Sequence, residues 1–160
     1  MLSYRHGFHA GNHADVLKHT ALVALLRILA RKDKPLLVVD THAGAGMYSL
    51  EQGFAVRNAE FRGGIGALWE RSDLPESVTD YLDQVRAVNP DGVLRQYPGS
   101  PRIALGVLRP QDRLRLFELH STEGAILARQ FAQEGRRVTV TAGDGFAGLK
   151  AVLPPPSRRG

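Results

Sequence analysis

Residues 36–46, LLVVDTHAGAG, join a short apolar run to a glycine turn, and this junction constrains the fold more than any other stretch. The run LLVVD is rich in valine, which is typical of a strand buried on both faces of a parallel sheet. Gly44 and Gly46 follow it directly and allow the backbone to approach a ligand closely, as at the carboxyl ends of strands in open α/β sheets. The junction predicts a ligand site at a strand end, although a GxG turn alone is a weak motif.

Helical and extended segments alternate around this junction. A helix is predicted over residues 13–32, because Asn12 can cap it, Asp15 lies in its first turn and the apolar residues follow the helical period. After the junction, Ser100 as cap and Pro101 at the first helical position predict a second helix. The rest of the chain is predicted as strand, helix, strand and helix over residues 114–120, 121–135, 137–145 and 146–153. This alternation predicts an α/β fold with a parallel sheet.

The segment 48–98 differs in character and is predicted to be an inserted helical subdomain. Residues 61–73 and 74–88 are typical of short helices, the second capped by Asp73 and begun at Pro75, and no strand is convincing there. Residues 1–47 and 99–160 then form the core domain. The insertion also explains why Glu118 follows the glycine turn by about 70 residues instead of the usual 20 or so.

Three acidic residues, Asp40, Glu118 and Asp144, follow or end predicted strands and should share one edge of the sheet. In nucleotide-binding sheets, an acid at the end of the second strand takes the ribose hydroxyls, and Glu118 is the candidate here. A positively charged sulfonium tolerates such acids and needs no phosphate cradle, so the pattern favours S-adenosylmethionine over a dinucleotide. For each acid the alternative is a helix cap or turn residue.

Composition and the pattern of apolar residues exclude several classes of protein. The 160 residues contain no cysteine, which excludes disulfides and thiolate metal ligands, and the net charge of +5 favours a polyanionic partner. The amino terminus has no apolar signal region, and the longest apolar run is interrupted by Arg27 and too short to span a bilayer. We therefore expect a cytoplasmic protein that is neither secreted nor inserted in a membrane.

The stretch HAGNHADVLKH at residues 9–19 raises the possibility of a metal site. His9 and His13 are four residues apart and His6 lies nearby, but no carboxylate has a matching spacing and the backbone before Asn12 is not expected to be helical. We expect no metal, and favour hydrogen bonds from these histidines that order the amino-terminal loop, with RNA contact as the alternative.

Several motifs together resemble one family. The segments YRHGFHAGNHADVLKH, DTHAGAG, YPGSP, FELH and LPPPSRRG are similar to the RlmJ family of large-subunit ribosomal RNA adenine-N6 methyltransferases over essentially the whole chain. The resemblance implies a Rossmann-like S-adenosylmethionine-dependent methyltransferase core with an inserted helical subdomain, ribosomal RNA as substrate and Tyr4 as a residue that handles it. It implies a cofactor site formed by Lys18, His19, His42, Ser100, Glu118, Asp144 and Gly145.

The sequence departs from the family pattern at its end. Members continue past the SRRG segment into a strand and an Asp-Pro-Pro-Tyr motif that holds the target amine, whereas this chain stops at Gly160. The resemblance therefore implies catalytic residues after Gly160 and an incomplete parallel sheet. We expect the 160 residues alone to transfer no methyl group and to self-associate through the uncovered edge of LLVVD, and a longer chain to lose both defects.

Two alternatives from other classes stay open at this point. One is a non-catalytic adenosine- or RNA-binding module, and the other is a metal-dependent hydrolase that uses the histidines. The reading frame beyond Gly160 distinguishes the first from an enzyme, and metal analysis of the purified protein tests the second.

Overall fold

The computed structural model describes residues 6–153, and its main sheet is parallel, as predicted. β1 (Leu37–Asp40) pairs with β4 (Arg113–Glu118), which pairs in turn with β5 (Val138–Ala142). The strand order is thus β1-β4-β5, and the carboxyl ends of all three strands lie at one edge. β1 is the outer strand of this described sheet, which agrees with the expectation that LLVVD is left with an open edge.

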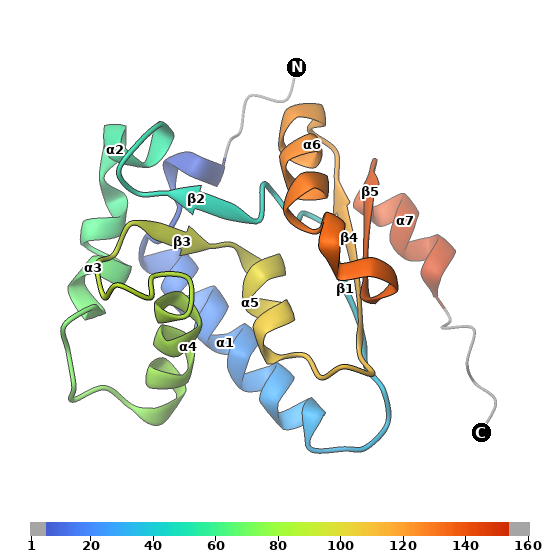
Figure 1. The fold of residues 1–160 in the computed structure, drawn as a ribbon, viewed down its shortest axis with the longest axis horizontal. Coiled ribbons are helices and arrows are strands. Elements are labelled where there is room, and N and C mark those ends of the chain that lie inside the picture. Colours follow the sequence, from blue (N-terminus) through green and yellow to red (C-terminus); the bar gives the residue numbers. More distant parts are fainter. Residues whose placement is uncertain (1–5, 154–160) are drawn as a thin grey trace.

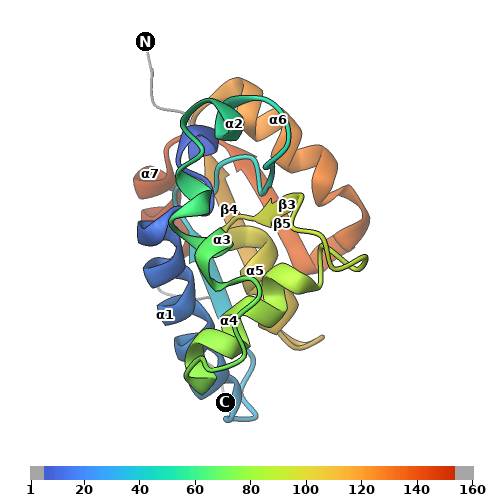
Figure 2. The same ribbon diagram turned by 90° about the vertical axis from the view of Figure 1, so that its left-hand side faces the viewer.

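Helices cover both faces of the sheet. α5 (Ser100–Val107) leads to β4, α6 (Ser121–Gln130) and the short η3 (Ala132–Arg137) join β4 to β5, and α7 (Gly145–Val152) follows β5. Figure 2 shows α6 and α7 on opposite sides of the strands. Leucines of β4 and of the helices α1 (His13–Ala30), α5 and α6 form a buried core beside the sheet. The predicted order of strands and helices after residue 99 is confirmed.

The segment between the glycine turn and α5 is mostly helical, but the prediction that it holds no strand was wrong. β2 (Met47–Ser49) pairs antiparallel with β3 (Gln96–Pro98). Each strand has only three residues, too few to produce an alternating pattern, and the pair is stabilised by the buried cross-strand neighbours Tyr48 and Tyr97. The boundaries at residues 47/48 and 98/99 stay a prediction.

Four short helices lie between β2 and β3. They are α2 (Phe54–Asn58), η2 (Glu60–Arg62), α3 (Ile65–Leu68) and α4 (Glu76–Arg86). Figure 1 shows them gathered with β2, β3 and α1 on the side of the molecule away from β5 and α7. They enclose a second buried core around Ile65, Tyr81, Val85 and Tyr97. α1 contributes Val23 to this core and Leu26 to the first, so one helix supports both parts.

Two helix starts differ from their predictions. Asp73 does not cap α4, because its carboxylate pairs with the Arg71 guanidinium and Pro75 occupies the cap position. Ser100 is the first residue of α5 instead of its cap, which is Gly99. The Ser100 hydroxyl donates to the Asp40 carboxylate at 2.7 Å, so the strand-end acid outcompetes the helix backbone for this group. Asn12 caps α1 as predicted, with its side chain accepting from the Asp15 backbone N–H.

None of the helices among residues 6–153 is both long and apolar enough to cross a membrane.

Candidate functional site

A cavity of about 380 Å³ opens at the carboxyl edge of the parallel sheet. Its wall contains the loop after β1, the end of β4 and the start of α7, together with α1 and the start of α5. The size suits a cofactor, since small-molecule sites in proteins typically enclose about 300–1,000 Å³. The structure brings all seven predicted cofactor residues to this one cavity, namely Lys18, His19, His42, Ser100, Glu118, Asp144 and Gly145. Tyr4, the predicted RNA residue, lies outside the described residues.

Asp40 does not line the cavity but fixes two residues that do. Its carboxylate accepts the Ser100 hydroxyl at 2.7 Å and the His42 backbone N–H at 3.0 Å. The end of β1 therefore holds the start of α5 and the first turn of the following loop. Its role in the structure is to support the site from outside the cavity.

Glu118 lies at the end of β4 with its carboxylate held by backbone donors. Oε2 accepts from the Gly44 N–H and Oε1 from the His120 N–H, each at 2.7 Å. Gly44 has a φ of +63°, and a Cβ there would lie 2.3 Å from the Tyr48 hydroxyl, so the turn requires glycine. An ionised carboxylate offers about four acceptor positions, which leaves Glu118 with capacity for further donors.

Asp144 caps α7, so the alternative role considered for it is what the structure shows, and it also lines the cavity. Its Oδ1 accepts from the backbone N–H of Phe146 at 2.8 Å. Gly145 next to it approaches the backbone of Thr41 so closely that a Cβ would lie 2.1 Å from the Thr41 carbonyl oxygen. The start of α7 therefore packs directly on the loop after β1.

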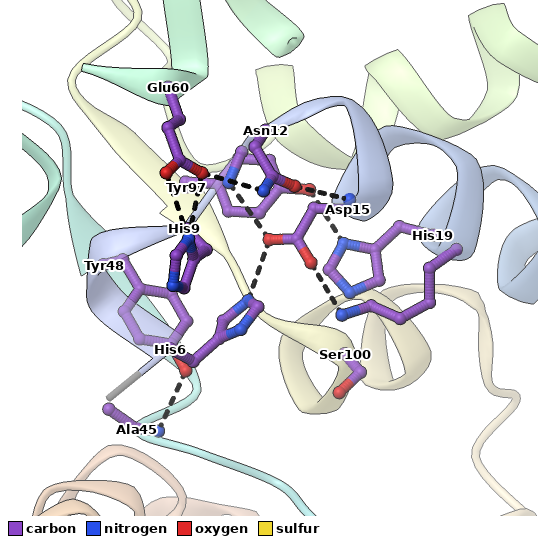
Figure 3. A network of polar contacts seen from close by, with 12 residues as sticks. His6, His9, Asn12, Asp15, His19, Ala45, Tyr48, Glu60, Tyr97 and Ser100 are labelled. Carbon is purple, nitrogen blue, oxygen red and sulfur yellow. Dashed lines mark hydrogen bonds and ion pairs between the residues drawn. The ribbon is translucent and has the colours of Figure 1, made fainter. Parts of the chain in front are cut away.

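Asp15 is the centre of a polar network that the sequence analysis missed (Figure 3). Its side chain is 1% exposed and accepts from His6 Nε2 at 2.8 Å, Lys18 Nζ at 2.6 Å and the Gly11 backbone N–H at 3.0 Å. Burial alone raises the pKa of Asp15, but the hydrogen bonds from His6 and Lys18 and the nearby positive charge bring it well below its usual range. The buried carboxylate thus positions two residues of the cavity wall, His6 and Lys18.

A second network joins the amino-terminal loop to η2. The Glu60 carboxylate contacts His9 Nδ1 at 2.9 Å and accepts from the Asn12 side-chain amide at 3.0 Å. His6 and His9 therefore make the loop-ordering hydrogen bonds that we expected, whereas His13 is exposed at the start of α1. Among the residues that the structure describes, no three His, Cys, Asp or Glu side chains are placed to hold a metal ion.

His19 connects the cavity to the helical segment behind it. Its Nδ1 lies 2.8 Å from the Tyr97 hydroxyl, and the two rings stack with their centroids 5.8 Å apart. The Tyr97 hydroxyl also lies 3.0 Å from that of Tyr81 on α4. Burial lowers the pKa of His19 to about 3, so its ring is neutral at pH 7.

Sequence reasoning missed further residues of the cavity wall. Tyr48, Leu119, His120 and Glu123 line it from β2, from the loop after β4 and from α6. His120 is the last residue of the predicted strand and Glu123 follows it closely, which was the available signal for them. The Nδ1 atom of His120 is buried without a hydrogen-bond partner among the described residues.

Comparisons with known proteins give one result. The family model described as "Ribosomal RNA large subunit methyltransferase D, RlmJ" matches residues 33–160. The whole chain is 52% identical to the Ribosomal RNA large subunit methyltransferase J of Escherichia coli (strain K12) and 47% identical to the protein of that name from Haemophilus influenzae. In each case it spans 57% of the relative's length.

A solved structure gives the same result for the fold. The crystal structure of a Legionella pneumophila protein matches with a TM-score of 0.84 at 42% sequence identity, over 92% of this chain and 54% of that protein. This likeness and the parallel β1-β4-β5 sheet confirm the prediction of a Rossmann-like core. Because the family model covers most of the sequence, the chain belongs to the RlmJ family of ribosomal RNA large subunit methyltransferases.

Proposed function

We propose that this chain forms the cofactor-binding part of an S-adenosylmethionine-dependent enzyme that methylates an adenine N6 in large-subunit ribosomal RNA. The observation that carries the proposal is the convergence of seven residues, spread from Lys18 to Gly145, on one cavity at the carboxyl edge of the sheet. Family membership supports the activity, and the proposed substrate implies a cytoplasmic location.

The residues around the cavity fit this cofactor. Glu118, Glu123 and Asp144 make the wall acidic, which suits the positive charge of a sulfonium and disfavours a pyrophosphate. When bound, the cofactor supplies an electrophilic methyl group on its sulfur.

The protein's own residues act mainly by binding and alignment. Glu118, already fixed by the Gly44 and His120 backbone donors, has acceptor positions left for ribose hydroxyls. Lys18 and His19 also line the cavity, and they are held in place by hydrogen bonds with Asp15 and Tyr97. Methyl transfer to an amine depends on aligning amine, carbon and sulfur, so a rigid wall contributes more than acid or base strength.

Ribosomal RNA is the proposed partner. The net charge of +5 favours binding to phosphates, and Arg62 on η2 is exposed two residues from Glu60, which holds the amino-terminal loop. We propose that this loop, with Tyr4, faces the RNA. A stacked adenine must be turned out of its helix before its N6 can reach the cavity.

Calorimetry with S-adenosylhomocysteine, with ATP as control, tests the cofactor assignment. We expect saturable binding of the first at one site and none of the second. A methyl-transfer assay on unmodified large-subunit ribosomal RNA with the full-length protein tests the reaction. Binding of S-adenosylhomocysteine without any transfer by the full-length protein would favour the non-catalytic adenosine-binding module.

A further inference from the structure

Three buried side chains form a hydrogen-bonded series that ends at the cavity. Tyr81 on α4 and Tyr97 on β3 are both 0% exposed, and their hydroxyl oxygens lie 3.0 Å apart. The Tyr97 hydroxyl lies 2.8 Å from Nδ1 of His19, a residue of the cavity wall. Burial raises the pKa of both tyrosines, so each keeps its proton at pH 7.

Only one arrangement of the protons in this series leaves no buried hydroxyl proton without an acceptor. Tyr97 is the sole described hydrogen-bond partner of the Tyr81 hydroxyl. If His19 donated from Nδ1 to Tyr97, one of the two tyrosine hydroxyl protons would be buried without an acceptor. If Tyr81 donates to Tyr97 and Tyr97 donates to Nδ1, both tyrosine protons have an acceptor. A buried unpaired donor is costly, so the second arrangement is favoured.

The neutral His19 ring then carries its proton on the other nitrogen, Nε2. Among the residues that the structure describes, the His19 ring has a hydrogen bond at Nδ1 and none at Nε2. In Figure 3 the ring lies between Tyr97 and Ser100, with Nε2 directed away from the tyrosine. The charged and titratable groups around it are Asp15, Lys18 and His6. Asp15 is occupied by Lys18 and His6, which leaves the Nε2–H available to the cavity.

We propose that Tyr97 is a positioning residue that fixes His19 as the Nε2–H tautomer and thereby makes it a hydrogen-bond donor to the cofactor. This inference rests on the proposed function for the identity of the ligand. The matching ligand group is an acceptor, and the neighbouring Lys18 ammonium favours one with negative charge, such as a carboxylate. The segment 48–98 would thus set the chemistry of one wall of the site through the Tyr97 hydroxyl.

Nitrogen NMR of the full-length protein labelled with ¹⁵N-histidine reads the tautomer directly at pH 7. In the wild type we expect a single His19 form with Nδ1 as acceptor and Nε2 protonated. Tyr97→Phe removes the donor, so both nitrogens should shift toward values averaged over two tautomers. Tyr81→Phe is the matched control, because Tyr97 still has only Nδ1 to donate to, and its His19 signals should stay close to those of the wild type.

Calorimetry with S-adenosylhomocysteine on the same proteins measures the consequence for binding. We expect Tyr97→Phe to weaken binding by up to about tenfold, the worth of one hydrogen bond, and Tyr81→Phe to weaken it less. A wild-type His19 protonated on Nδ1 would overturn the proposal without need of any variant. So would a Tyr97→Phe protein with unchanged His19 signals and affinity. The expected tautomer in a protein that does not bind S-adenosylhomocysteine would instead refute the proposed function.

Discussion

The Glu118 carboxylate accepts the Gly44 backbone N–H at 2.7 Å, which ties the end of β4 to the glycine turn after β1. These two residues are far apart in the sequence, and the contact lies where neighbouring parallel strands end. The same carboxylate also holds the backbone that leads into α6. One side chain therefore shapes two loops of the cavity, which makes it the most informative residue to change.

Replacing Glu118 by alanine should weaken binding of S-adenosylhomocysteine by about 1–3 kcal/mol, because a charged acceptor for ribose hydroxyls is removed. Isothermal calorimetry measures this change, with Glu70→Ala as control because Glu70 is exposed and does not line the cavity. Equal affinity in the wild type and the Glu118 variant would show that Glu118 only shapes the loops.

The parallel sheet was predictable because burial on both faces leaves a clear pattern of apolar residues. Residues 36–40 and 114–120 indicated strands whose observed bounds are Leu37–Asp40 and Arg113–Glu118. The pair β2–β3 was not predictable, since three-residue strands have no period and depend on Tyr48 and Tyr97 meeting across the pair. The local pattern of apolar residues thus predicted the buried strands of the parallel sheet. It did not predict the β2–β3 pair, because this pair forms only through contacts between distant parts of the chain.

Strand ends predicted several residues of the cavity wall, whereas the polar network inside α1 was missed. Glu118 and Asp144 followed from their position after predicted strands, whereas His19 came only from the family resemblance. A signal for its network was present, since Asp15, His19 and Val23 are spaced by four and all three are buried on one face of α1. Polar residues on an otherwise apolar face indicate an internal network, but the sequence does not say that Tyr97 is its partner.

Asp15→Asn should destabilise the protein by about 1–3 kcal/mol at pH 7, because His6 and Lys18 lose a charged acceptor. The folded-state pKa of Asp15 is depressed, so its contribution is full above the unfolded value of about 3.9 and is lost as the pH falls further. Urea unfolding at pH 7 and at several pH values below 4 measures both effects. Asp73→Asn, in an exposed ion pair with Arg71, should cost less than about 1 kcal/mol. If the difference in unfolding free energy between the wild type and Asp15→Asn did not shrink below pH 4, this would contradict the assignment of Asp15 as ionised in the folded protein.

His19 should make the protein less stable as the pH falls from about 6.5 toward 3. The pKa of His19 in the folded protein is about 3, so between these values the unfolded chain binds a proton that the folded protein does not. The expected loss is about 1 kcal/mol per pH unit. His19→Asn keeps an oxygen for Tyr97 to donate to but does not titrate, so its stability should fall less steeply between pH 6.5 and 5. His13→Asn, at an exposed position, should follow the wild type.

Arg57 and Arg62, exposed on α2 and η2, should contact phosphates of the RNA substrate. Replacing both by alanine should lower the slope of log K against log salt concentration by about 0.7–0.9 for each phosphate that is no longer neutralised. Binding of large-subunit ribosomal RNA measured at several salt concentrations gives this slope. Arg129→Ala combined with Arg136→Ala, exposed on α6 and η3, is a charge-matched control. An Arg57 and Arg62 double variant that keeps the wild-type slope would place the RNA elsewhere.

The 160 residues studied alone should self-associate through apolar surface on α1 and the open edge of β1. Leu17, Leu25 and Ile28 are 74%, 54% and 57% exposed, and their spacing places them along one face of the helix. Exposed apolar stripes and unpaired strand edges both favour contact between copies. Sedimentation velocity over a range of protein concentrations should show oligomers, and a double substitution Leu25→Glu with Ile28→Glu should shift them toward the monomer. Val93→Glu changes an exposed apolar residue outside α1 and should leave the distribution as it is. If the double variant associates as strongly as the wild type, α1 is not the surface involved, and the edge of β1 becomes the next site to block.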